Sequence, residues 1–338
     1  FLQEEGVQGI FIKGDSSIRY FTGFTGGESL LYVDALRAVL ITDSRYILQA
    51  QQQAPECEIL EHQHGLFSVV DQVRPAWRLA LDGDYFSYTE ATALQKALPK
   101  ASFKNVNLVF LRAVKSPEEQ RKMFKAAAIA DDAFHELIPH IKVGRRESEL
   151  AAELEYNMRK RGAQKTSFDT IVASGVRSAL PHGVASNKVI EEGDFVTFDF
   201  GCIYDGYCSD MTRTVVMGKA APWQKEIYEI VLAANELGEE VLFPGIEVDQ
   251  AVRDFIASKG YGAYFGHGLG HGVGLDIHEK PNLNKGNPDP IPVGAIVTVE
   301  PGIYLPGKGG VRIEDTVIVT EWGCERLTLV EKELMEIL

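Results

Sequence analysis

Short apolar runs alternate with polar, helix-forming stretches over the first hundred or so residues. Three of these runs predict strands: GIFI at 9–12, SLLYV at 29–33 and AVLIT at 38–42. Asp43 is predicted to cap a helix over residues 44–54, and residues 88–98 predict another helix. Strands that alternate with helices in this way indicate a small α/β domain.

The segment LRAVKSPEEQRKM contains a strong helix-start signal. Ser116, Pro117 and Glu119 have the spacing of an N-cap, a first helical residue and a capping-box acceptor. The helix is predicted to stop at Pro139. A second helix is predicted from about Glu147 to Lys160.

The change of pattern at this segment predicts a domain boundary near Val114. The chain has 338 residues, which is long for one core and comfortable for two domains. We therefore expect a small N-terminal α/β domain over residues 1–113 and a second domain over 114–338. With 45% hydrophobic and 24% charged residues, the composition is that of an ordinary globular protein.

The second domain contains an internal echo. Residues 192–199 read EGDFVTFD and residues 293–300 read VGAIVTVE, so both carry a glycine, then Val-Thr, then an acid. Each segment continues into a glycine-bearing hairpin and a second acid-containing strand, CSDMTRT in the first case and GVRIEDT in the second. The repetition predicts two half-domains that face each other across one site.

The echo places four acids at equivalent positions: Asp199, Asp210, Glu300 and Glu314. Burying a carboxylate costs on the order of several kcal/mol, because the group loses its hydration, unless a cation or a hydrogen-bonding partner compensates. Any one of these acids could instead pair with an arginine or lysine, or end a strand in water. Four that converge would repel one another and would require cations.

Between the two halves lies YFGHGLGHGVGLDIHEKP, which carries His267, His271 and His278 among closely spaced glycines. The segment lacks both the HExxH pattern of a zinc-protease helix and the spacing of a nucleotide-binding loop. A single buried histidine is usually a satisfied core residue, but a cluster of three favours a binding site. His182, in ALPHGVAS, is a fourth candidate.

Carboxylates with one imidazole favour hard or borderline cations. Two divalent ions about 3.5–4 Å apart can share bridging carboxylates and activate a water molecule. We expect two ions per chain, with Mn²⁺ first and Co²⁺ or Zn²⁺ as alternatives.

The ordered motifs FDFGCIYDGYCSDMTRT, GHGLGHGVGLDIHE, VEPGIY and RIEDT resemble those of the pita-bread metallopeptidases. Within that superfamily the chain most resembles the Xaa-Pro aminopeptidases (aminopeptidase P) and the Xaa-Pro dipeptidases (prolidases). SIRYFTGFTG and ITDSRY resemble the creatinase-type N-terminal domain of the same enzymes. The resemblance implies a mixed α/β (α+β) fold, whose second domain has a curved antiparallel sheet with pseudo-two-fold symmetry.

The resemblance also implies a metal-ligand set. Asp199 and Asp210 would bind one ion, with Asp210 bridging. His271 and Glu300 would bind the other ion, and Glu314 would bridge.

Further roles follow from the same resemblance. His182 and His278 match histidines that contact the substrate or the tetrahedral intermediate. His267 matches an additional histidine of the proline-specific branch, and Arg312 matches an arginine that steadies the hydrogen bonds around the metals. Glu300 would also act as general base and proton shuttle.

The expected function is hydrolysis of the N-terminal Xaa-Pro bond of peptides by a metal-bridging hydroxide, in an aminopeptidase. The Xaa-Pro dipeptidase is the alternative, ahead of methionine aminopeptidase, which usually lacks so large an N-terminal domain. Creatinase resembles both domains but does not keep the metal ligands. A non-catalytic pita-bread binding module would also have lost ligands, whereas all five are present here.

The charge and the cysteine content bear on which classes of partner and which cellular location to expect. The formal net charge of −14 and the absence of a basic run argue against nucleic acid, and no apolar run approaches the roughly 18 residues of a membrane span. The four cysteines form no CxxC pair, which favours reduced thiols and a cytoplasmic location. We expect peptide substrates and, from the resemblance, a homodimer.

Overall fold

A computed structural model of the chain describes residues 1–243, 247–287 and 291–338. It divides into two compact units, Phe1–Leu111 and Arg112–Leu338. Within the described ranges, every helix is either too short or too polar to cross a bilayer.

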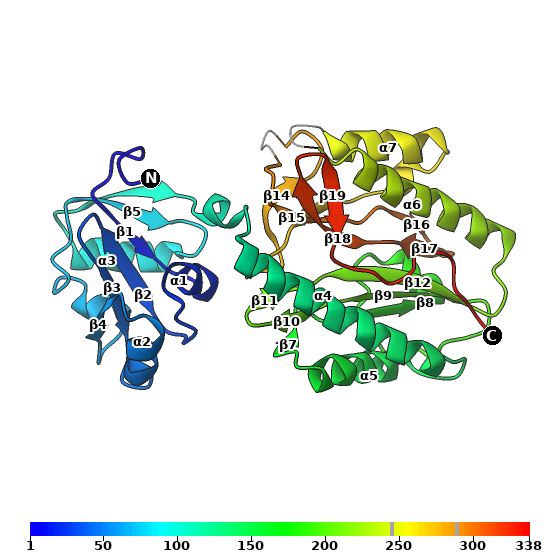
Figure 1. Cartoon of the computed structure of the whole chain (residues 1–338), viewed down its shortest axis with the longest axis horizontal. Helices are drawn as coiled ribbons and strands as arrows, with labels where there is room; N and C mark the ends of the chain where they lie inside the picture. Colours follow the sequence, from blue (N-terminus) through cyan, green and yellow to red (C-terminus); the bar gives the residue numbers. More distant parts are fainter. Residues whose placement is uncertain (244–246, 288–290) are drawn as a thin grey trace. The chain divides into compact units, whose positions relative to one another are not determined.

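The N-terminal unit is built on one mixed sheet with the strand order β4-β3-β2-β1-β5-β6 (Figure 1). Its strands are β1 (Gly9–Ile12), β2 (Leu30–Asp34), β3 (Ala38–Thr42), β4 (Glu58–Glu61), β5 (Arg78–Asp82) and β6 (Ser102–Val106). Its α-helices are α1 (Asp15–Thr22), α2 (Ile47–Gln53) and α3 (Tyr88–Ala97). The strands at 9–12, 29–33 and 38–42 and both helices are therefore present as predicted, within one to three residues at each end.

Both faces of this sheet are covered. Because side chains alternate along a strand, Ile10 and Ile12 of β1 pack in one cluster with residues of α1 and α2, whereas Phe11 packs in another with Leu94 of α3. One prediction was wrong in its detail: Asp43 does not cap α2. Its carboxylate accepts hydrogen bonds from the backbone and side chain of Arg45, so the segment forms a turn and the helix begins only at Ile47.

The C-terminal unit begins with the predicted helix start. Ser116 caps α4 (Pro117–Leu137), and Glu119 completes the capping box. The α-helix ends at Leu137, and a short 3₁₀ turn, η3 (Ile138–His140), contains the predicted stop. The next helix is α5 (Glu147–Lys160), with the predicted bounds.

Two sheets follow, with the strand orders β20-β12-β9-β8 and β14-β13-β15-β18-β19. The first contains β8 (Ile171–Ser174), β9 (Phe195–Phe200), β12 (Met211–Met217) and β20 (Glu336–Ile337). The second contains β13 (Gly270–Gly272), β14 (Glu279–Leu283), β15 (Ile296–Val299), β18 (Asp315–Thr320) and β19 (Gly323–Arg326). Shorter pairings are made by β7 (Lys165–Thr166), β10 (Cys202–Tyr204), β11 (Tyr207–Cys208), β16 (Gly302–Leu305) and β17 (Gly309–Arg312). Among the residues of this unit that the structure describes, the strand pairings are antiparallel except that of β12 with β20.

Each sheet has its own helical cover (Figure 1). One buried cluster joins α4 and α5 to β8, β9 and β12. The other joins α6 (Pro222–Glu240) and α7 (Val248–Ser258) to the second sheet. The unit is therefore two sheet-and-helix halves, and the echoed strand pairs, β9 with β12 and β15 with β18, are equivalent elements of these halves.

Candidate metal centre

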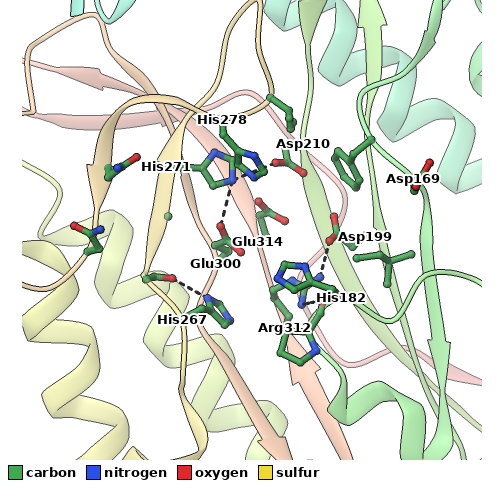
Figure 2. Close-up of a pocket in the computed structure, with 18 of the residues that line it drawn as sticks. Asp169, His182, Asp199, Asp210, His267, His271, His278, Glu300, Arg312 and Glu314 are labelled. Carbon is green, nitrogen blue, oxygen red and sulfur yellow. Dashed lines mark hydrogen bonds and ion pairs between the residues drawn. The ribbon is translucent and has the colours of Figure 1, made fainter. Parts of the chain in front are cut away.

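The two halves direct their four acids to one place (Figure 2). In the first half, Asp199 lies near the end of β9 and Asp210 directly precedes β12. In the second, Glu300 directly follows β15 and Glu314 directly precedes β18. A β-bridge between Thr212 and Glu314 joins the halves at this point.

Asp210, His271 and Glu314 form a tight group, in which one ligand atom from each lies within 4.8 Å of the others. The Nε2 atom of His271 lies 3.6 Å from Asp210 Oδ2 and 3.4 Å from Glu300 Oε1. Oxygen and nitrogen donors that surround a gap of this size are typical of a metal site.

The hydrogen bonds of His271 fix which of its nitrogens can bind a cation. Its Nδ1 lies 3.0 Å from the carbonyl oxygen of Gly272. A carbonyl only accepts, so Nδ1 carries the hydrogen and, in the neutral ring, Nε2 presents a lone pair to Asp210 and Glu300. Desolvation lowers the pKa of His271, which favours this neutral form. A lone pair directed at carboxylates is repulsive unless a cation lies between them.

A glycine allows His271 to lie this close to the acids. An added Cβ at Gly270 would lie 2.0 Å from the carbonyl oxygen of Thr298, the residue that donates its hydroxyl hydrogen to Glu300. Only glycine fits between these backbones without displacement. The glycine spacing noted in the sequence therefore has a packing reason at this position.

Burial and mutual repulsion raise the pKa values of the clustered acids. Desolvation and then the charge of Glu314 raise the pKa of Asp210 well above its ordinary value. Desolvation and then the charge of Glu300 act in the same direction on Glu314. Desolvation raises the pKa of Glu300 to about 7. Divalent cations would favour the ionised carboxylates and so oppose these shifts.

Only one of the two carboxylate oxygens of Asp199 has a hydrogen-bond partner among the described residues. Its Oδ2 accepts a hydrogen bond of 2.6 Å from the guanidinium of Arg312. Its Oδ1 is buried and has no hydrogen-bond partner among the described residues. A buried carboxylate oxygen normally has a partner, so this atom is available as a ligand, and the donor set as a whole fits divalent cations.

Arg312 also connects Asp199 to His267. It donates to the Tyr304 hydroxyl at 3.0 Å, and that oxygen lies 2.8 Å from His267 Nε2. The Nδ1 of His267 donates to the carbonyl of Gly268, so Nε2 accepts from the tyrosine hydroxyl. Desolvation lowers the pKa of His267 to about 4 and keeps its ring neutral.

The remaining two histidines are more exposed. His182 follows a 3₁₀ turn, η4 (Gly175–Ala179), and His278 precedes β14. The ring centroid of His278 lies 4.4 Å from that of His271. Both histidines line the same cavity as the acids (Figure 2).

This cavity has a volume of about 460 Å³, within the range of small-molecule sites. All nine residues selected from the sequence line it. The rest of the lining is formed by Phe168, Asp169, Ile171, Pro181, Val184, Gly268, Gly270, Ile277, Asn282 and Asn284. A cavity of this volume, lined in part by apolar and amide side chains, can hold a ligand of small-peptide size.

Sequence reasoning missed three residues that hold the site. Thr212 donates to Glu314 at 2.6 Å, Thr298 donates to Glu300 at 3.2 Å, and Tyr304 links Arg312 to His267. Thr298 was visible in the Val-Thr pattern that both segments of the repeat share, and Thr212 in the shared pattern of an acid, any residue and a threonine. The tyrosine gave no such signal beyond its place in VEPGIY.

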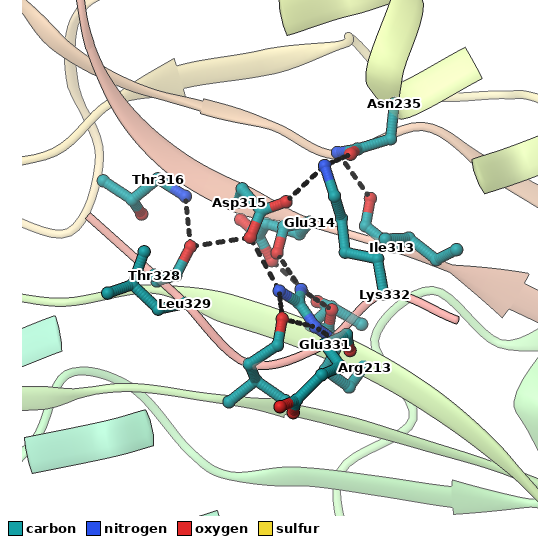
Figure 3. A network of polar contacts seen from close by, with 12 residues as sticks. Arg213, Asn235, Ile313, Glu314, Asp315, Thr316, Thr328, Leu329, Glu331 and Lys332 are labelled. Atoms are coloured by element: carbon teal, nitrogen blue, oxygen red, sulfur yellow. Dashed lines mark hydrogen bonds and ion pairs between the residues drawn. The ribbon is translucent and has the colours of Figure 1, made fainter. Parts of the chain in front are cut away.

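A buried polar network lies behind the acids (Figure 3). Arg213 donates to the carbonyl of Glu314 at 2.6 Å and pairs with Asp315 at 2.7 Å. Lys332 lies 3.1 Å from the same Asp315 and donates to Asn235, whose side-chain amide donates to the carbonyl of Val299. Val299 and Asp315 are neighbours of Glu300 and Glu314 in the chain. The network therefore fixes the backbone from which two of the acids project.

Comparison with known proteins decides the family. Residues 121–321 match the model of metallopeptidase family M24. The chain belongs to this family. Residues 1–113 match the Creatinase/Prolidase N-terminal domain. The resemblance stated from the motifs, the predicted fold class and the expectation of a metal-dependent hydrolase are thereby confirmed.

Several relatives of this M24 protein match along its whole length. The chain is 41% identical to the Xaa-Pro dipeptidase of Pyrococcus furiosus, over 99% of this chain and 97% of that protein. It is similar in structure to the Xaa-Pro dipeptidase from Bacillus anthracis, with 46% identity, a TM-score of 0.95 and coverage of 99% and 96% of the two chains. It is also similar to the X-Pro aminopeptidase from Thermotoga maritima, with 40% identity, a TM-score of 0.89 and 98% coverage of each chain.

Proposed function

We propose that this M24 peptidase is an Xaa-Pro dipeptidase that hydrolyses the bond before proline. The observation that carries the proposal is the full-length similarity to proteins named Xaa-Pro dipeptidase, together with a cavity that contains all nine selected residues. The preference drawn from the sequence, an Xaa-Pro aminopeptidase, becomes the second candidate. It is supported by the relative named X-Pro aminopeptidase.

The five ligands would be Asp199, Asp210, His271, Glu300 and Glu314, holding two divalent ions, with Mn²⁺ as the first choice. Such ions activate water and polarise a carbonyl when bound. The neutral Nε2 of His271 and the unpartnered Oδ1 of Asp199 supply donors from opposite halves of the unit. Arg312 keeps the other oxygen of Asp199 in place.

Proton movement is assigned to Glu300. Its carboxylate lies at the cavity wall beside His271, with one oxygen held by Thr298. From this position it would accept a proton from the attacking water and deliver it to the proline nitrogen. Delivery matters because this nitrogen belongs to a tertiary amide and needs a proton to leave. His278 and His182, on the cavity wall, would donate hydrogen bonds to the oxygen that gains charge.

A panel of three peptides tests the proposal. Purified protein is incubated with Ala-Pro, Ala-Pro-Ala or Met-Ala-Ser in the presence of Mn²⁺ or Co²⁺, and again after treatment with a chelator. We expect Ala-Pro to give the highest kcat/KM, loss of activity with chelator and recovery on adding metal. Preference for Ala-Pro-Ala would assign the aminopeptidase, and preference for Met-Ala-Ser would refute proline specificity. Activity that is independent of divalent metal would refute the metal site.

A further inference from the structure

We infer that Lys115 and Arg112 are positioning residues for His278, acting through a buried charge cluster with Glu279 and Asp276. The inference rests on the proposed function, because it concerns how the catalytic site is assembled. The cluster comprises these four residues, and it lies in the C-terminal unit beside the catalytic cavity.

The cluster is compact and its charges balance. Lys115 Nζ lies 3.2 Å from one oxygen of Glu279, and Arg112 lies 3.4 Å from the other. Arg112 also bonds to Asp276 at 2.7 Å. The side chains of Lys115 and Glu279 are each only 1% exposed. Two cations therefore face two anions, and the pair of Lys115 with Glu279 lies where water hardly reaches, so an unpaired charge there would be costly.

The two acids lie on either side of His278 in the chain. The Oε1 atom of Glu279 accepts from the backbone N–H of Asp276, which closes the segment 276–279 into a tight loop. The carbonyl of Asp276 accepts from Gly274, whose own carbonyl accepts from Cys208 just before Asp210. The first and last residues of the loop, Asp276 and Glu279, are thus held by these bonds and by their ion pairs with Arg112 and Lys115.

Close packing leaves this loop little freedom. A Cβ added at Gly274 would lie 2.4 Å from Glu279 Oε2, so the carboxylate is in contact with the backbone of the loop. No hydrogen bond from the described part of the chain reaches the imidazole of His278, which packs against the ring of His271. The His278 ring is therefore positioned by its backbone and by its packing on His271, and the backbone is held by the cluster.

Arg112 and Lys115 come from the segment that precedes α4, more than 160 residues away from the loop. They do not line the cavity. Their effect on the reaction must therefore pass through the loop, and this separates a positioning role from a catalytic one.

A double-mutant cycle tests the inference. The variants are Lys115→Met, His278→Ala and the double variant, assayed with the best substrate of the wild-type protein. Lys115→Met should lower kcat about 10- to 100-fold, as loss of a supporting partner typically does, with metal content unchanged. In the His278→Ala background the same substitution should change kcat less than about threefold, because the residue it positions is absent. Lys115→Arg should restore most of the activity.

The matched control is Lys188→Met, which breaks the partly buried pair of Lys188 with Asp194 in the same unit but far along the chain from the loop. It should lower the melting temperature without lowering kcat. Multiplicative losses in the Lys115→Met/His278→Ala variant, or loss of metal from Lys115→Met, would overturn the inference. If Lys115→Met does not fold, Asp276→Asn, whose side chain is 32% exposed, replaces it in the cycle with the same expectations. If the wild-type protein hydrolyses only peptides without proline, the proposed function fails while the cycle can still be measured.

Discussion

Arg312 and Asp199 form a buried ion pair in which a guanidinium nitrogen lies 2.6 Å from Oδ2. The same guanidinium bonds to Thr212, Tyr304 and the carbonyl of Pro181. These bonds come from several nitrogens in a planar fork, which a lysine ammonium cannot imitate.

Arg312→Lys should therefore weaken metal binding and activity by about 10- to 100-fold, although the charge is kept. Calorimetric titration of the metal-free protein with Mn²⁺ measures the affinity, and kcat with Ala-Pro measures the activity. Arg37→Lys, which alters an arginine of the N-terminal unit, is a control for the change of residue type. Unchanged metal affinity in Arg312→Lys would contradict a role in holding Asp199.

Glu300→Gln should abolish turnover while the fold persists. The substitution keeps the size of the side chain but removes both a ligand charge and a proton acceptor, and a proton shuttle typically contributes ~10²–10⁴-fold. The rate is compared at equal metal loading, established by elemental analysis. A metal-loaded variant that keeps more than about a tenth of the wild-type rate would exclude Glu300 as the base, since that loss falls below the range for a shuttle.

The histidines should separate into two groups. His271→Ala should lose metal, because its Nε2 is the nitrogen directed at Asp210 and Glu300. His182→Ala and His278→Ala should instead retain metal and lower kcat by ~10²-fold or more, as loss of a donor to a developing oxyanion does. Metal content and kcat are measured on the same preparations. Loss of metal from His182→Ala with retention in His271→Ala would reverse the assignments.

Asp131 should make unfolding depend on pH in a predictable direction. Desolvation raises its pKa from 3.8 to about 6, so between these values the folded state binds a proton that the unfolded state has released. Its contribution to stability is thus greatest below about pH 4 and is lost as pH rises through about 6, by roughly 2–3 kcal/mol for two pKa units.

Asp131→Asn has no such proton to lose. The free energy of unfolding of Asp131→Asn should therefore increase relative to that of the wild type by this amount from pH 4 to pH 7, so the variant gains relative stability. Urea denaturation at both pH values measures it. A constant difference between the two proteins would show that the pKa of Asp131 is not raised.

Local signals predicted local structure well. The Ser116 capping box, the bounds of α5 and the strand at 38–42 follow from short-range patterns, and each is formed by contacts within a few residues. The capping prediction for Asp43 was wrong because Arg45, two residues on, binds the same carboxylate. Two local interactions competed for one side chain, and the sequence did not indicate which was stronger.

The internal repeat predicted more of the site than any single motif did, because it placed four acids at equivalent positions of two strand pairs. What the sequence could not predict were partners distant in the chain. Arg213 and Asp315 are separated by 102 residues, and Lys115 and Glu279 by 164. In the sequence, each of these charged residues looks like an ordinary solvent-exposed charge. Only the folded structure shows that it is buried and paired.

The five proposed ligands come from both halves of the C-terminal unit, and each half has its own hydrophobic core. Asp199 and Asp210 belong to the first half. The second half supplies His271, Glu300 and Glu314. An ion bound by both sets would therefore act as a removable cross-link along the seam at which Thr212 meets Glu314. Its binding free energy adds to the resistance of that seam against opening, in proportion to the logarithm of free metal concentration. Depletion of metal should then accelerate hydrogen exchange first at the amides along this seam, before either core loosens. The metal ions would in this way stabilise the contact between the two halves as well as take part in catalysis.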